Sequence, residues 1–116
     1  MDFDEIKQFK TQLADSLNVY NKPFSLFVDI RDFVPAEIDV IRQIQEIQKM
    51  CRHKSIKRAA VIISSPVVKR QLMQSSYISE TSDIDRIIDA TKADNWEEQA
   101  LEWIEHAVEP LSAITA

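Results

Sequence analysis

Apolar residues recur along the chain with the periods of helices and strands, and they predict an alternation of the two. Residues 3–20 carry apolar side chains at helical spacing, which indicates an amphipathic helix. Residues 24–30 and 57–64 each contain a nearly continuous apolar run, typical of strands covered on both faces, and residues 85–90 are predicted to form a shorter third strand. Each run is followed by a segment that again has helical spacing, so three strand–helix units are expected after the first helix.

Capping residues mark where the later helices should begin. Proline suits the first helical position, and Ser or Asn before a helix can accept a hydrogen bond from a free N–H group. The expected starts are Pro35 for the second helix, Ser65 with Pro66 for the third, and Asn95 with Glu98 for the last. The apolar face of the last helix is expected to run from Trp96 to Leu111.

This order of elements predicts an α/β fold. A helix followed by three strand–helix units favours a small, mostly parallel sheet wrapped by about four helices through right-handed crossovers. The chain has 116 residues, a length that suits one hydrophobic core. Repeats, low-complexity tracts and linkers are absent from the sequence, so residues 1–116 are interpreted as a single domain.

The absence of glycine excludes several kinds of site. The chain contains no glycine, whereas a phosphate-binding loop, a dinucleotide fingerprint, a nucleophile elbow and an EF-hand loop all require it. Tight turns are therefore expected to use the residues that best tolerate left-handed geometry. Those residues are Asn18, Asn21, Asp94 and Asn95.

Composition points to a cytoplasmic protein without a cofactor. The N-terminus is acidic rather than basic, and no apolar run approaches the ~20 residues needed to cross a bilayer. The one cysteine, Cys51, excludes an internal disulfide and is interpreted as a core residue. Cys51, His53 and His106 lack the spacing of zinc ligands, so no metal or other cofactor is expected.

Three stretches resemble a known family. NKPFSLFVDIRDFVP, KRAAVIISSPVVKRQL and RIIDATKADNWEEQALEWI are similar to the STAS-like family in its SpoIIAA-like branch, and the resemblance covers residues 3–108. That family contains anti-sigma-factor antagonists, cytoplasmic domains of transporters, and small stand-alone proteins compared with CRAL-TRIO lipid carriers. The resemblance implies a STAS-like domain that regulates or binds a partner.

The chain departs from the family pattern in two places. Family members usually begin with a strand pair before the first helix, and here that pair is apparently absent. Its absence would leave strand edges that need cover, either because this is a short form or because another chain pairs with them. The antagonists also carry a phosphorylatable serine at the start of the second helix, where residues 33–36 have no hydroxyl group. A phosphorylation switch is therefore not expected.

Polar residues follow each predicted strand and mark a candidate binding site. In parallel sheets, ligands gather beyond the carboxyl ends of the strands. The residues expected to converge there are Asp29, Arg31, Asp32, Ser64, Ser65 and Thr91. A phosphoryl-accepting role for Asp29 lacks the D-x-D spacing, and the alternative is that Asp29 and Asp32 cap the turn and pair with Arg31. Ser64 and Ser65 could hold an anion at a helix start, or Ser65 could serve as an N-cap.

Charge is unevenly distributed along the chain. Between residues 49 and 70 there is no acidic residue, and the basic block there comprises Lys49, Arg52, Lys54, Lys57, Arg58, Lys69 and Arg70. One interpretation is internal pairing with the acidic stretch after residue 70. The other is a patch for an acidic protein surface or for peripheral contact with an anionic membrane. Net acidity, with a formal charge of −5, disfavours nucleic acid.

Two functional hypotheses follow. The first is a non-catalytic regulatory or protein-interaction domain that resembles anti-sigma-factor antagonists but lacks their serine. The alternative is a small carrier of an apolar or lipid-like ligand. An enzyme is not expected, because no catalytic set is recognisable. Uncovered strand edges lead us to expect a homodimer.

Overall fold

A computed structural model describes residues 3–19, 24–54 and 56–111 of the chain. Helices and strands alternate after the first helix, as the apolar pattern predicted. The elements in order are α1 (Phe3–Val19), β1 (Leu26–Asp29), α2 (Ile38–His53), β2 (Ala59–Ile63), α3 (Pro66–Ile78), β3 (Asp85–Asp89) and α4 (Trp96–His106). Within the described residues no strand precedes α1.

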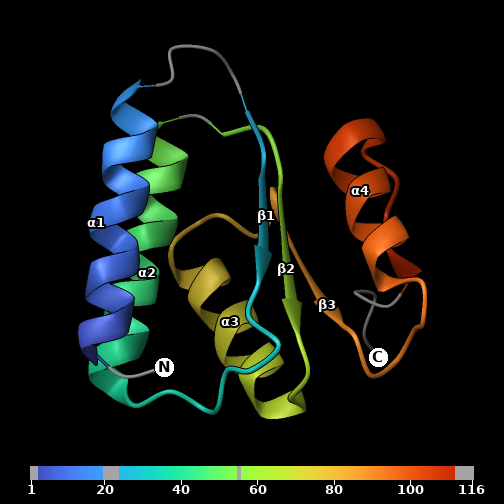
Figure 1. The fold of residues 1–116 in the computed structure, drawn as a ribbon, viewed down its shortest axis with the longest axis horizontal. Coiled ribbons are helices and arrows are strands. Elements are labelled where there is room, and N and C mark those ends of the chain that lie inside the picture. Colours follow the sequence, from blue (N-terminus) through green and yellow to red (C-terminus); the bar gives the residue numbers. More distant parts are fainter. Residues whose placement is uncertain (1–2, 20–23, 55, 112–116) are drawn as a thin grey trace.

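The three strands form one parallel sheet in the order β1-β2-β3 (Figure 1). Leu26 is paired with Ala59 and Ala59 with Asp85, so the three strands start level and end at one rim. β2 is buried on both faces because it lies in the middle of the sheet, which explains its continuous apolar sequence. The predicted α/β fold with a small parallel sheet is confirmed.

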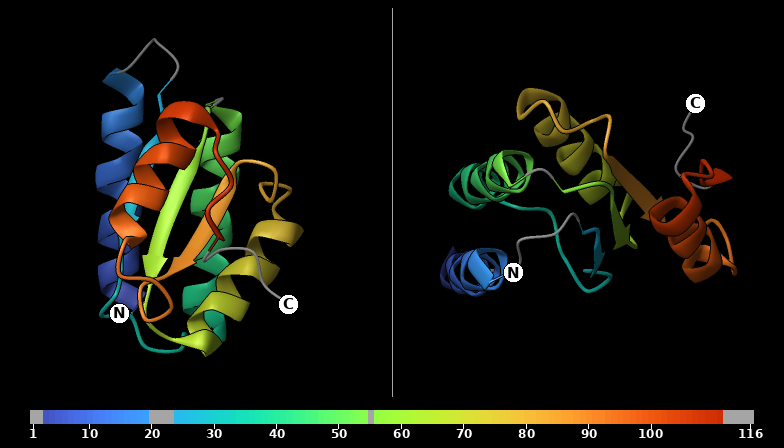
Figure 2. Two further views of the ribbon diagram at one scale, coloured as in Figure 1. Left: turned by 90° about the vertical axis from the view of Figure 1, so that its right-hand side faces the viewer. Right: turned by 90° about the horizontal axis from the view of Figure 1, so that it is seen from above.

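The two faces of the sheet are covered unequally. α1, α2 and α3 lie on one face, and α4 lies alone on the other (Figures 1 and 2). The three-helix side holds a core of aliphatic side chains centred on Ile44, Ile63 and Val68. On the other side, Trp103 of α4 packs against Ile62 and the rest of the middle of the sheet. α1 packs mainly on α2, and its Ile6 belongs to the same core as Ile63 and Ile87 of the sheet.

The second helix begins later than Pro35 suggested. α2 starts at Ile38, and Glu37 before it has extended backbone angles. The Gln71 side chain, from α3, accepts a hydrogen bond from the Ala36 N–H group at 2.9 Å and donates one to the Ala36 carbonyl at 3.0 Å. The Ala36 carbonyl is therefore already engaged, and a helix starting at Pro35 would need it for the Val40 N–H group. The expectation for Pro35 was wrong because a distant side chain holds the loop.

The last helix ends earlier than its apolar pattern suggested. α4 stops at His106, and Ala107 takes a left-handed conformation with φ of 56°. The Ala107 N–H group donates to the Trp103 carbonyl at 3.0 Å, which closes the helix end. Leu111, expected on the buried face, is 78% exposed. Pro110 helps to explain the difference, because the residue before a proline disfavours helix.

Left-handed backbone also falls on residues that the sequence did not indicate. Among the described residues, the two with positive φ that are not glycine are Glu80 and Ala107. Of the expected turn residues, Asn21 lies outside the described part of the chain. Ser65, in contrast, caps α3 as predicted, because its Oγ accepts a hydrogen bond from the Val68 N–H group at 3.4 Å and Pro66 occupies the first turn.

Candidate functional site

The carboxyl ends of β1 and β2 form a polar pocket of about 630 Å³. Four of the six residues predicted for this rim line it, namely Asp29, Arg31, Asp32 and Ser64. The sequence analysis missed Glu5, which α1 brings to the same pocket. No local pattern could have indicated Glu5, since its place depends on how α1 packs. The apolar walls are Ile30 and Phe33.

Arg31 is held by two neighbours at this rim. Its guanidinium donates hydrogen bonds to both carboxylate oxygens of Asp29 at 2.9–3.1 Å, and it lies 4.5 Å from the centre of the Trp96 ring. The hydrogen bonds from Arg31 lower the pKa of Asp29, and those to Asp29 raise the pKa of Arg31. Asp29 is thus ionised and paired, which agrees with the interpretation that it closes the turn after the strand.

The two remaining predicted rim residues make local bonds instead. Ser65 is the N-cap of α3, as described above. Thr91 donates from its hydroxyl to Asp89 Oδ1 at 2.6 Å, and its N–H group donates to the same atom at 2.9 Å. Neither Ser65 nor Thr91 lines the rim pocket. Local turn and cap geometry accounts for both residues.

The basic block is divided between the two ends of the sheet. Lys49, Arg52, Lys54, Lys57 and Arg58 lie where α2 ends and β2 begins, whereas Lys69 and Arg70 lie in the first turns of α3, beyond the other end of β2. Three members of the first group bond to neighbouring elements. Arg52 donates to the Glu80 carbonyl at 2.5 Å, Lys54 to Asn18 Oδ1 at 3.2 Å, and Arg58 to the Ile104 carbonyl at 3.0 Å. The structure therefore does not bring the seven residues into one patch.

Lys69 is buried rather than displayed. Its exposed fraction is 6%, and burial lowers the pKa of its ammonium group, while the charge of Asp89 acts in the opposite direction. Asp89 is itself buried at the end of β3. A surface that attracts anions would include Arg70, which is exposed, but not Lys69.

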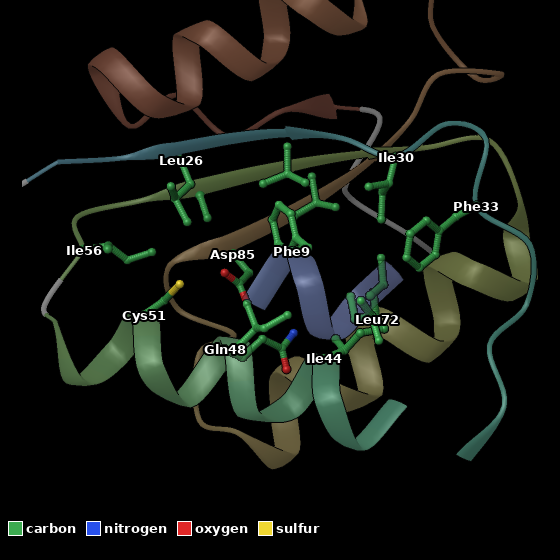
Figure 3. Close-up of a pocket in the computed structure, with 15 residues that line it drawn as sticks. Phe9, Leu26, Ile30, Phe33, Ile44, Gln48, Cys51, Ile56, Leu72 and Asp85 are labelled. Atoms are coloured by element: carbon green, nitrogen blue, oxygen red, sulfur yellow. The ribbon is translucent and has the colours of Figure 1, made fainter. Parts of the chain in front are cut away.

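A second hollow, almost entirely apolar, lies between the sheet and the helices on its three-helix side. Its volume is about 100 Å³, and Figure 3 shows side chains from the sheet, α1, α2 and α3 pointing into it. Deeper lining residues such as Ile44 and Ala59 are buried, whereas Phe9 on α1 and Val28 on β1 are half-buried. Ile30 and Phe33 line both this cavity and the rim pocket.

Two polar side chains interrupt the apolar wall of this cavity. Asp85 of β3 accepts hydrogen bonds on Oδ2 from Ser76 and from Thr81, each at 2.7 Å. Burial raises the pKa of Asp85, against the effect of these hydrogen bonds. Gln48 of α2 has a buried Oε1 atom without a hydrogen-bond partner in the described structure. The sequence analysis missed this cluster, although the serines near the end of α3, among them Ser76, were a visible signal.

Cys51 also faces the cavity and is chemically inert there. Burial raises the pKa of its thiol to about 12, with a further contribution from the charge of Asp85. A thiol with so high a pKa stays protonated and is a poor nucleophile or metal ligand. Its position agrees with the interpretation of Cys51 as a core residue.

The edge formed by β1 is a third candidate site. The Leu26 N–H group donates to the Arg58 carbonyl at 3.0 Å and the Ile30 N–H group to the Ile62 carbonyl at 2.9 Å, so these residues face β2. The alternate residues, Phe27 and Asp29, direct their N–H and C=O groups away from the sheet. Across the described ranges, no hydrogen bond joins these outward backbone groups to another part of the chain. Phe27 beside them is 40% exposed.

His, Cys, Asp and Glu side chains in the described part of the chain do not gather in threes as a metal ion would require. Of the helices described, none combines the length and apolar character needed to cross a membrane.

Comparison with known proteins gives no relative. No family model, curated protein or solved structure matches this chain.

Proposed function

We propose that this protein is a non-catalytic regulatory or protein-interaction domain, of the STAS-like kind that its sequence resembles. The observation that carries this proposal is the β1 edge, where the backbone groups of Phe27 and Asp29 face outward. An extended segment of another chain can add to such an edge through main-chain hydrogen bonds. The exposed ring of Phe27 adds an apolar contact beside them.

The paired rim residues also fit binding better than chemistry. Asp29 and Arg31 satisfy each other, which leaves neither poised as a nucleophile or a base. The four predicted residues in the rim pocket would instead fix the end of β1 and present a polar border to a partner. As in the sequence analysis, the absence of a hydroxyl from residues 33–36 means that no phosphorylation switch is proposed there.

The first partner to test is a second copy of the chain. Two β1 edges can pair about a two-fold axis, which is the commonest symmetry of protein dimers. Light scattering at micromolar concentration should then give twice the chain mass of 13.4 kDa. A single species of 13.4 kDa would contradict self-association. The partner would then be a different protein.

A backbone substitution separates edge pairing from other contacts. In Phe27→Pro the outward N–H group is lost, but no bond to β2 is, because that group does not face β2. We expect this variant to be folded and monomeric. Phe27→Thr is the matched control, since it removes the ring and keeps the N–H group, and it should retain part of the association. A dimer that survives Phe27→Pro unchanged would contradict pairing through β1.

A second candidate function is a small carrier of an apolar or lipid-like ligand. The specific observation that favours it is the apolar cavity between the sheet and the helices on its three-helix side. Native mass spectrometry of freshly purified protein tests this function directly. A mass above that of the bare chain that disappears on denaturation would support a carrier, and the bare mass in every preparation would count against it.

A further inference from the structure

We infer that the apolar cavity selects neutral, compact hydrocarbons of about five or six carbon atoms, and that long-chain lipids and fatty acids are not its ligands. This inference rests on the second proposed function, the carrier, and narrows the class of its ligand. Three observations carry it together, namely the volume of the cavity, its largely apolar wall, and the absence of a basic residue from the described lining.

The volume of the cavity limits the size of the ligand. At about 100 Å³ it is somewhat smaller than an engineered cavity of ~150 Å³ that holds benzene. A five-membered ring therefore fits it better than a six-membered ring. The acyl chain of a membrane lipid has far more carbon atoms than benzene, so the cavity cannot enclose such a chain.

The wall of the cavity favours a ligand without polar groups. Its described lining residues are mostly aliphatic or aromatic, for example Ile44, Ile47 and Leu72, and they come from the sheet and from α1, α2 and α3 (Figure 3). Apolar cavities offer water few hydrogen bonds, so an apolar molecule that enters competes with little solvent. The burial of its surface and its contacts with the wall then favour binding.

The carboxyl group in the wall already has partners within the protein. Asp85 Oδ2 accepts hydrogen bonds from the hydroxyl groups of Ser76 and Thr81, each at 2.7 Å. Because two donors of the protein bind this oxygen, a ligand does not have to supply a third donor to it. A hydrocarbon without a hydroxyl group can therefore occupy the cavity and leave these two hydrogen bonds in place.

The charges of the wall exclude anionic ligands. Lys, Arg and His are absent from the described lining residues, which include one acidic residue, Asp85. A fatty-acid carboxylate in the cavity would lie in the same apolar site as the Asp85 carboxyl group, without a cation from the wall to pair with it. An unpaired charge is costly to bury there, and two carboxyl groups that share such a site oppose each other's ionisation. The ligand is therefore neutral.

Three probes test the inference on the intact protein. Cyclopentane, cyclopentanecarboxylate and hexadecanoate, the last below its micelle concentration, are titrated into ¹⁵N-labelled protein at about pH 7, where free carboxylic acids are ionised. Cyclopentane should shift the amide signals of Ile44, Cys51 and Val61 and leave that of Ala100, on the other face of the sheet, unchanged. The ring carboxylate should bind at least about tenfold more weakly than cyclopentane. Hexadecanoate should neither shift these amides nor displace cyclopentane.

Two variants change the volume of the cavity in opposite directions. Ala59→Val adds methyl groups to the buried wall, so the affinity for cyclopentane should fall at least about tenfold. Ile44→Val enlarges the cavity by about one methylene group, and the ratio of cyclohexane to cyclopentane affinity should rise about threefold. If Ala59→Val does not fold, the ratio in Ile44→Val and the three probes on the wild-type protein decide the question.

The outcomes distinguish the ligand class from the carrier function. Displacement of cyclopentane by hexadecanoate, or equal affinities for cyclopentane and its carboxylate, would overturn the inference and leave the carrier standing. An unchanged affinity for cyclopentane in folded Ala59→Val would show that the ring binds outside the cavity, which would also overturn the inference. If none of the three probes binds, both the inference and the carrier function fail.

Discussion

The two edges of the sheet differ in how their backbone groups are covered. At the β3 edge the Asp85 N–H group donates to the Thr81 carbonyl at 3.0 Å, and the Asp85 carbonyl accepts from the Arg86 guanidinium at 2.8 Å. At the other end of this edge the Lys92 N–H group donates to the Asp89 carbonyl at 3.1 Å. At the β1 edge, the groups of Phe27 and Asp29 lack such partners within the described structure.

The two edge strands also differ in how well their surroundings cover them. β3 is followed and preceded by loops that fold back on its ends, and α4 covers the face that β3 shares with β2. β1 is a strand of four residues whose outer face is half-covered, with Phe27 exposed beside it. The covered edge serves stability, whereas the uncovered edge is available for binding.

The largest expected effect tests how much the covered side depends on α4. Trp103 is buried, its Nε1 donates to the Ala59 carbonyl at 3.1 Å, and the Arg86 guanidinium stacks 4.0 Å from its ring centre. Trp103→Ala should reduce the free energy of unfolding by about 3–5 kcal/mol. Phe27→Ala, on the uncovered side, should cost about 1 kcal/mol. Urea denaturation measures both, and equal losses would remove the contrast between the two sides.

The next largest effect is expected in amide hydrogen exchange, where backbone N–H groups at the two edges should exchange at different rates. In dilute, monomeric protein the N–H groups of Phe27 and Asp29 should exchange on the order of 100-fold faster than that of Asp85, a difference of about 2–3 kcal/mol in opening free energy. At concentrations where a dimer forms through β1, the Phe27 and Asp29 amides should slow while that of Asp85 does not change. Equal exchange at both edges under all conditions would contradict the assignment of an uncovered β1.

The pH dependence of the free energy of unfolding tests the contribution of Asp85 at the covered edge. Its pKa is raised in the folded state, so the stability it contributes is fully present below its unfolded pKa and is lost as pH rises through the folded value. As pH rises above about 4, the ordinary pKa of an aspartate, the free energy of unfolding should therefore fall in the wild-type protein and stay flatter in Asp85→Asn. Urea denaturation at several pH values measures this, and parallel curves for the two proteins would contradict it.

The smallest effect is expected at the end of β1. Asp29 and Arg31 are paired at the surface, so Asp29→Asn should lower Tm by less than about 2 °C and leave binding intact. Because Arg31 lowers the pKa of Asp29, its contribution is present above the unfolded pKa and lost as pH falls. Calorimetry checks the stability. A large loss of any measured activity in this variant would instead favour a catalytic role for Asp29.

The strands and the start of α3 were predictable because their signals are local. The apolar run around Ile62 marks a strand buried on both faces, and Ser65 before Pro66 marks a helix start within a few residues. The rim followed from these, since strands of a parallel sheet end together. Asp29, Arg31, Asp32 and Ser64 therefore met in one pocket as their positions implied.

What the sequence did not reveal depends on contacts between distant segments. Gln71 holds Ala36 from 35 positions away and delays α2. The basic block is contiguous in sequence, but its two parts lie at opposite ends of β2 because a strand of five residues separates them. The bonds of Asp85 to Ser76 and Thr81 required knowing that the end of α3 returns to the start of β3.

The hydrogen bonds that occupy the ends of the β3 edge limit how large an assembly can grow. A chain with two available edges could add neighbours on both sides and extend without limit, as filaments do. Here the Thr81, Arg86 and Lys92 bonds occupy both ends of the β3 edge, so a strand laid there would find backbone partners only around Ile87. Each molecule is then monovalent for strand addition, and an assembly joined through β1 is complete with two chains.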